Sequence, residues 1–197
     1  MKFDTPTMTP YTVFPDWVFD GKLEINEEQR KSLINYASTL DKIETHSGWT
    51  TKFAHMKGQL LTASNLVGNM FFQNVVSHFA LPEKLKDITV TDSQFTFVRP
   101  GANVPAHIVR MRWYTGVLFL DGATGGSNLY LDPMNTKMYA TPSPLIQEFT
   151  HFIDFQPMRL VFFPAHIPWG FTPNNSQMGS MFYTFSFHIN PPDQKKR

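Results

Sequence analysis

Apolar residues recur at helical spacing in two stretches of the first half of the chain, which predicts two helices. The first helix is expected to start after Asn26, a suitable N-cap with Gln29 three residues later, and its apolar stripe begins at Leu33. The second is expected over residues 64–81, where an apolar side chain occurs at every fourth position and Pro82 ends the helix.

From Ile88 onward the pattern changes to alternation and to runs of β-branched and aromatic residues, which predicts strands. The predicted strands cover residues 88–90, 94–98, 108–120, 128–131, 159–163 and 181–189. Turn residues such as Asp121-Gly122 separate them. Helices followed by strands indicate an α+β fold, and the number of strands suits a double-stranded β-helix, or jelly roll, with the N-terminal helices packed on one sheet.

The length of 197 residues predicts a single domain with a sizeable core. Its expected parts are an extended arm or first strand over 1–22, a helical layer over 23–85, the jelly-roll core over 86–190 and a polar tail over 191–197. The first part carries three prolines with aromatic residues between them, which is typical of an extended segment anchored by its side chains.

Composition and charge narrow the classes of function. The formal net charge of +1 gives no electrostatic argument for nucleic acid or membrane as a partner. The absence of cysteine excludes disulfides and thiol chemistry and fits a reducing compartment. No 18-residue apolar run and no hydrophobic leader are present, so a cytoplasmic protein is expected, in the host cytoplasm or the virion if the chain is viral. Nineteen phenylalanines favour a core or interface of large flat side chains.

Three segments carry candidate chemistry. They are 107–120, which begins with a histidine, 125–133, which begins with Gly-Gly, and 161–173, which contains Phe163-Pro164. In this order they resemble the iron(II)/2-oxoglutarate dioxygenases, and specifically the compact prolyl-hydroxylase-like members common in phage genomes. The resemblance covers roughly residues 90 to 190 and implies a jelly roll around a metal site.

The chain departs from the metal ligands that this resemblance implies. In the family a His is followed two residues later by Asp or His; here the pair is His107 and Val109, and a valine has no lone pair to offer. The position of the second His is Trp169, whose indole nitrogen only donates. His166 is a possible substitute ligand; a regular strand would turn it away, and a bulge near Pro168 would turn it inward.

The co-substrate position departs as well. The family holds the distal carboxylate of 2-oxoglutarate with an Arg on the last strand, because a guanidinium pairs with it through two hydrogen bonds. Here that position is Phe182. Thr184 and Ser186 share its inward face by alternation, and Asn128 is a further candidate for lining the pocket.

Three functions remain open. The first, which the three departures favour, is a catalytically degenerate protein that needs no cofactor and serves as a structural or binding subunit, for example of a phage particle, with a second copy or another protein as partner. In it, Trp169 and Phe182 would fill the space of iron and co-substrate. The second is an active oxygenase that uses Fe(II) and 2-oxoglutarate through His107, His166 and a carboxylate that the sequence does not place. The third is a ligand-binding jelly roll that kept its cavity without a metal.

Overall fold

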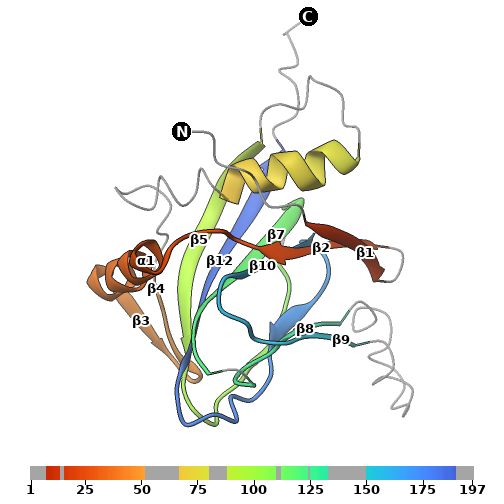
Figure 1. Cartoon of the computed structure of the whole chain (residues 1–197). Coiled ribbons are helices and arrows are strands. Elements are labelled where there is room, and N and C mark those ends of the chain that lie inside the picture. Colours follow the sequence, from red (N-terminus) through yellow and green to blue (C-terminus); the bar gives the residue numbers. More distant parts are fainter. Residues whose placement is uncertain are drawn as a thin grey trace, which may run out of the picture.

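A computed structural model describes residues 8–13, 16–51, 67–79, 88–109, 112–123, 125–132 and 150–189. They form two antiparallel sheets, and the helices lie against the larger one (Figure 1). This arrangement is the predicted α+β jelly roll with helices on one sheet. Within the described ranges, no helix is long and apolar enough to cross a membrane.

The larger sheet has eight strands in the order β1-β2-β10-β7-β12-β5-β4-β3. Their bounds are β1 Thr9–Val13, β2 Asp16–Lys22, β3 Lys42–Thr45, β4 Gly48–Thr51, β5 Ile88–Val98, β7 Tyr114–Asp121, β10 Arg159–Pro164 and β12 Ser180–Ile189. The smaller sheet has the order β6-β11-β8-β9. Its strands are β6 Val104–His107, β8 Leu129–Leu131, β9 His151–Ile153 and β11 Trp169–Phe171.

Alternation along the strands divides the interior into two apolar clusters. In β12, the side chains of Tyr183 and Phe185 belong to the cluster under the helices, whereas Phe182 belongs to the cluster between the two sheets. Thr184 pairs with Val117, which also faces the smaller sheet. Phe182 and Thr184 therefore share the face toward the smaller sheet, because residues two apart on a strand share a face.

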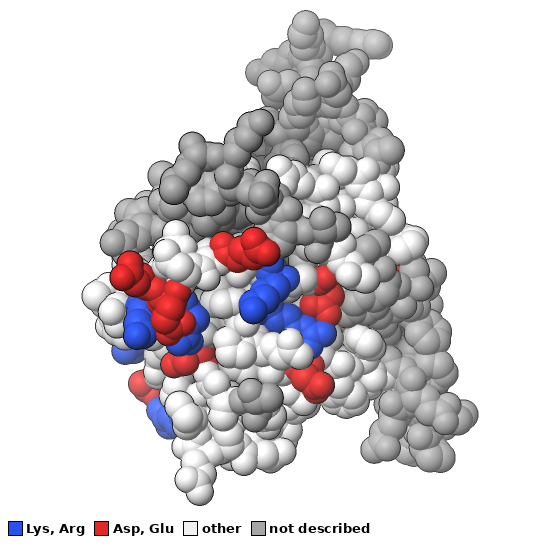
Figure 2. Space-filling model, viewed as in Figure 1, with Lys and Arg blue, Asp and Glu red and all other residues white. Residues whose placement is uncertain are grey.

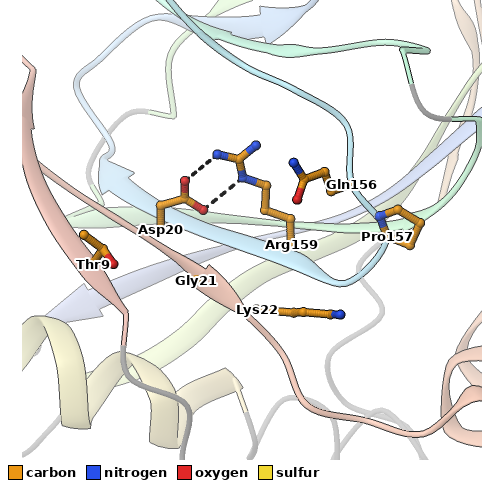
Figure 3. Close-up of a pocket in the computed structure, with 7 residues that line it drawn as sticks. All are labelled: Thr9, Asp20, Gly21, Lys22, Gln156, Pro157 and Arg159. Carbon is orange, nitrogen blue, oxygen red and sulfur yellow. Dashed lines mark hydrogen bonds and ion pairs between the residues drawn. The ribbon is translucent and has the colours of Figure 1, made fainter.

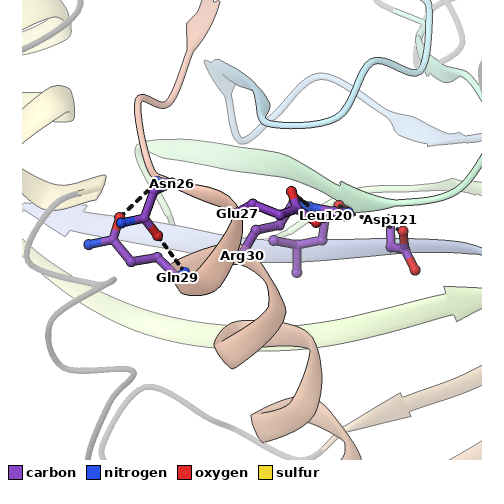
Figure 4. Close-up of polar contacts among 6 residues, drawn as sticks. All are labelled: Asn26, Glu27, Gln29, Arg30, Leu120 and Asp121. Atoms are coloured by element: carbon purple, nitrogen blue, oxygen red, sulfur yellow. Dashed lines mark hydrogen bonds and ion pairs between the residues drawn. The ribbon is translucent and has the colours of Figure 1, made fainter.

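Both predicted helices are present within the described residues. Helix α1 spans Glu27–Thr39 and begins at the expected capping box, in which the side chain of Asn26 accepts from Gln29 N and the side chain of Gln29 accepts from Asn26 N (Figure 4). Arg30 holds the helix to the larger sheet, since its Nη1 lies 3.0 Å from the carbonyl oxygen of Leu120 (Figure 4).

The second helix covers residues 67–79 and contains a π-helical segment, η1, over Phe72–Val76. The ring of Phe71 stacks on that of Phe187 with centroids 3.8 Å apart, which fixes the helix on the outer face of β12. The ends of the predicted 64–81 helix lie outside the described residues.

Three strand predictions were incomplete. Residues 108–120 were expected as one strand, but β6 ends at His107 and β7 begins at Tyr114, because the chain crosses between the two sheets there. The short strands β6, β9 and β11 were not predicted. The hairpin β3–β4 was also missed, inside the expected helical layer of 23–85. All four residues of β3 are exposed, so this edge strand carries no alternation that a sequence pattern would reveal.

Replacing Asn26 with Ala is expected to lower the free energy of unfolding by about 1 kcal/mol, because the Gln29 amide loses its acceptor at the helix end. Chemical denaturation measures this loss. Asn35→Ala in the same helix is the matched control; Asn35 is exposed in the helix interior, where Ala is the better helix former, so no loss is expected. Equal losses for the two variants would contradict the capping role.

Candidate functional site

His107 lies at the end of β6, opposite Trp169 of β11. The next pair in this ladder is Val104 with Phe171, so β6 holds one residue more than β11 between the two pairs. This bulge lets His107 and Val104, three positions apart, both share the face of their β11 partners. The ring centroids of His107 and Trp169 are 4.2 Å apart. His107 therefore contacts a buried member of the cluster between the sheets while the residue itself is exposed.

The surroundings of His107 favour a neutral ring. Partial burial against its neighbours lowers its pKa, and a hydrogen bond to the Pro105 carbonyl opposes this shift. The His107 Nδ1 atom is 3.2 Å from that carbonyl oxygen. A carbonyl only accepts, so Nδ1 carries the proton and the lone pair is on Nε2. His107 alone thus keeps the form of a metal ligand.

The two residues expected to complete the metal site both contact the apolar cluster between the sheets. Val109, just beyond the end of β6, packs on the cluster between the sheets. Trp169 is 3% exposed, and its ring contacts Phe163 and Phe171 at centroid distances of 5.8 and 5.7 Å. Its buried Nε1 has no hydrogen-bond partner among the described residues. Neither side chain offers an electron pair to a metal ion.

Phe182, the residue expected at the co-substrate position, belongs to the same cluster. Its ring stacks on Phe171 with centroids 3.8 Å apart and planes inclined by 18°. Phe119 and Phe155 meet it edge to face at 5.4 and 5.7 Å. Phe171 contacts Trp169 edge to face and stacks on Phe182, so a continuous set of ring contacts joins the residues expected at the second metal position and the co-substrate position.

The polar residues expected to line a pocket have structural partners. Thr184 donates to the carbonyl of Gln94 at 3.3 Å, and Ser186 is buried. The side-chain oxygen of Asn128 accepts from the Phe155 amide at 3.0 Å, which ties β8 to the segment after β9. These contacts join strands within the described fold.

His166 and the arginines lie elsewhere. His166 is exposed in the turn after β10, and its Nε2 is 3.1 Å from an Asp16 carboxylate oxygen at the start of β2. Every arginine in the described ranges pairs with a carboxylate: Arg30 with Glu27 and Asp121, Arg99 with Glu44, Arg112 with Asp92, and Arg159 with Asp20. Across these ranges, no three His, Asp or Glu side chains come together to hold a metal.

The residues expected at the metal and co-substrate positions therefore do not fit iron(II) and 2-oxoglutarate. An iron(II) oxygenase centre takes two imidazoles and one carboxylate on one side of the metal, and this site offers one imidazole. A 2-oxoglutarate carboxylate in the space of Phe182 would lose its hydration without a guanidinium to replace it.

A separate pocket of about 740 Å³ opens beside β1, β2 and β10 (Figure 3). Arg159 and Asp20 lie along it and are joined by two hydrogen bonds of 3.0 and 2.5 Å (Figure 3). Arg159 also donates to the Asp154 carbonyl. The two residues of this ion pair are 139 positions apart in the sequence, so no local sequence motif could have predicted it. This ion pair joins β2 to β10, and its two charges neutralise each other. Among the residues that line the pocket, Lys22 is the exposed cation.

Of the comparisons with known proteins, the one with solved structures identifies the fold. No family model and no curated protein matches the chain. Among solved structures, an oxidoreductase of the 2OG-Fe(II) oxygenase family from Burkholderia pseudomallei matches with a TM-score of 0.63 and 9% identity, over 88% of this chain and 86% of that one. A prolyl-4-hydroxylase from Pseudomonas putida gives 0.57 and 14%, over 88% of each chain.

HygX from Streptomyces hygroscopicus, with nickel and 2-oxoglutarate bound, gives a TM-score of 0.60 and 6% identity over 88% of this chain and 83% of its own. The chain thus has the double-stranded β-helix of the 2OG-Fe(II) oxygenases. At these identities the likeness concerns the fold alone.

Proposed function

We propose that this chain keeps the oxygenase fold without iron- and 2-oxoglutarate-dependent catalysis, and that it acts as a structural or binding subunit for another protein chain. The observation that carries the proposal is the common environment of three residues. Trp169 and Phe182, which are expected at the second metal position and the co-substrate position, are buried members of the apolar cluster between the sheets. Val109, which is expected at the carboxylate position, is partly buried and packs against the same cluster.

The chemistry of that cluster supports the absence of both cofactors. A single imidazole with no carboxylate beside it leaves iron(II) with mostly water as ligands, which is a weak site. A dicarboxylate in the aromatic stack would have to displace rings in mutual contact and lose its hydration. Without a cofactor in its interior, such a protein would act through contacts between its surface and a partner.

The rival is an active oxygenase with displaced ligands. HygX binds nickel and 2-oxoglutarate on the same fold, so the scaffold is compatible with that chemistry. The rival needs His166 beside His107, however, and the side chain of His166 pairs with Asp16 on the outside of the sheet end. The geometry therefore favours the first proposal.

Anaerobic addition of Fe(II) and 2-oxoglutarate to the purified protein is expected to give no metal-to-ligand absorption band, no succinate in air and no rise in melting temperature. A ligand at one hundred times its Kd would add about 2.7 kcal/mol to the stability, so a thermal shift would reveal binding even without turnover. The Pseudomonas putida prolyl-4-hydroxylase, treated in parallel, shows that the assay works.

His107→Ala is the matched variant, because His107 is the ligand that the site retains. A saturable band, a thermal shift and succinate release that all disappear in His107→Ala would overturn the proposal and establish the rival. Signals that His107→Ala leaves unchanged would come from metal bound elsewhere.

A further inference from the structure

The pocket beside β1, β2 and β10 is built on one face of the larger sheet. The strand registers pair Thr9 with Asp20 and Lys22 with Arg159, so these four side chains lie on the same side of three neighbouring strands. The loop before β10 adds a proline and the side chain of Gln156 to the lining (Figure 3). At about 740 Å³ the pocket has the size of sites that hold small organic molecules.

Two cations of this lining stand directly opposite each other. Lys22 and Arg159 are cross-strand partners, an arrangement that is unfavourable for like charges. In Figure 3 the guanidinium of Arg159 turns toward Asp20, which neutralises it, and the side chain of Lys22 extends the other way. Lys22 is exposed, and no carboxylate of the described residues forms an ion pair with it. The residues that line the pocket therefore carry one uncompensated positive charge.

The surroundings of the pocket favour a small anion over a large one. His151, on the edge strand β9 of the smaller sheet, lies close enough to Asp20 and Arg159 for their charges to act on its pKa, but burial lowers that pKa. Its ring is therefore neutral at pH 7. Figure 2 shows Lys and Arg side chains in the middle of the face with Asp and Glu side chains beside them, rather than a broad field of one sign. A polyanion such as nucleic acid would meet both signs there.

We propose that this pocket binds a small organic anion, with the carboxylate or phosphate group of the ligand against Lys22. The inference goes beyond the proposed function and does not depend on it, because the residues that line the pocket lie outside the apolar cluster between the sheets. An ammonium group without a carboxylate partner attracts an anion, and a charge-assisted hydrogen bond holds it.

The other lining groups suit the body of such a ligand. The ring of Pro157 and the aliphatic stem of Lys22 offer apolar surface, and the amide of Gln156 offers a hydrogen-bond donor and an acceptor. The ion pair of Asp20 and Arg159 joins β2 to β10, so these walls are in place before a ligand binds.

Benzoate is a suitable probe, because it combines one carboxylate with a flat apolar ring. Titration of the full chain with about 0.1 to 10 mM sodium benzoate at constant ionic strength is expected to give saturable NMR shifts of the backbone amides of Gly21, Lys22 and Gln156. A second titration with phenyl phosphate distinguishes a phosphate site from a carboxylate site. Benzamide, which has the same ring without the charge, should bind about tenfold more weakly or worse.

Lys22→Met replaces the ammonium group with an uncharged flexible side chain and should weaken benzoate binding about tenfold or more. Lys22→Arg keeps the charge and should stay within about threefold of the wild-type affinity. Lys31→Met, which removes another exposed lysine on α1, is the matched control and should change nothing. Gln156 is exposed and allows a test of both signs: Gln156→Lys should tighten binding and Gln156→Glu should weaken it, each about threefold.

No saturable shift with either benzoate or phenyl phosphate, equal binding of benzamide, or an affinity that Lys22→Met leaves unchanged overturns the inference. Each of these results would leave the proposed absence of iron and 2-oxoglutarate chemistry standing, because that rests on assays controlled by His107→Ala. A thermal shift with 2-oxoglutarate that Lys22→Met abolishes and His107→Ala retains would assign the binding of that anion to this pocket and not to the space between the sheets.

Discussion

Phe182→Arg is expected to unfold the protein rather than to restore a co-substrate site. Phe182 is 0% exposed and stacks on Phe171 inside a cluster whose members are all apolar. Truncation of such a ring to Ala costs about 3–5 kcal/mol. An arginine adds a buried cation with no partner in this cluster, so a loss above about 5 kcal/mol is expected, which equals the whole stability of many domains. Guanidinium denaturation and near-ultraviolet circular dichroism measure it.

Phe152→Arg is the matched substitution at a surface position. Phe152 is exposed on β9, so its replacement should change the free energy of unfolding by no more than about 0.5 kcal/mol. A folded Phe182→Arg protein with wild-type stability would mean that the interior has room for a guanidinium. A melting temperature that then rose with added 2-oxoglutarate would show that the co-substrate pocket is still present behind Phe182.

The three residues expected at the metal and co-substrate positions share one apolar environment. Phe171 contacts Trp169 on one side and Phe182 on the other, so the rings at the metal and co-substrate positions support each other. A His in place of Trp169 would leave part of this volume empty, and an Arg in place of Phe182 would bury a charge. The aromatic contacts thus stabilise the jelly roll, and single substitutions to His or Arg at these two positions are expected to weaken it.

Local signals predicted the parts of the fold that depend on neighbours in the sequence. The capping box of Asn26 and Gln29 fixed the start of α1, since both partners lie within one turn. Alternation along β12 placed Phe182 and Thr184 on the face toward the smaller sheet, because a strand turns successive side chains to opposite faces.

Features that depend on residues far apart were beyond the sequence pattern. The turn after β10 carries His166 to Asp16, 150 positions earlier, and nothing near His166 indicates that partner. The bulge in β6 that brings Val104 and His107 to one face arises from pairing with β11, a strand too short to be recognised by alternation. The direction of the His107 side chain therefore depends on the pairing of β6 with β11, which the sequence alone does not reveal.

Trp169 is expected to matter through the volume of its ring rather than through its indole N–H. Trp169→Ala should cost about 3–5 kcal/mol, because the ring is 3% exposed and contacts Phe163, Phe171 and His107. Trp169→Phe should cost about 1 kcal/mol or less. It loses some packing, but it also removes a buried N–H that has no partner among the described residues. Urea denaturation of both variants measures the difference.

Trp169→His completes the series, since it restores the residue type of the family's second metal ligand. Its ring is smaller than indole and brings polar nitrogens into the same apolar contacts, so its stability should fall between those of the Phe and Ala variants. Added Fe(II) should not recover the loss, because Val109 still provides no carboxylate. If Trp169→Phe proves as damaging as Trp169→Ala, the indole N–H has a partner that matters, and Trp169 acts as a donor to a bound molecule rather than as packing.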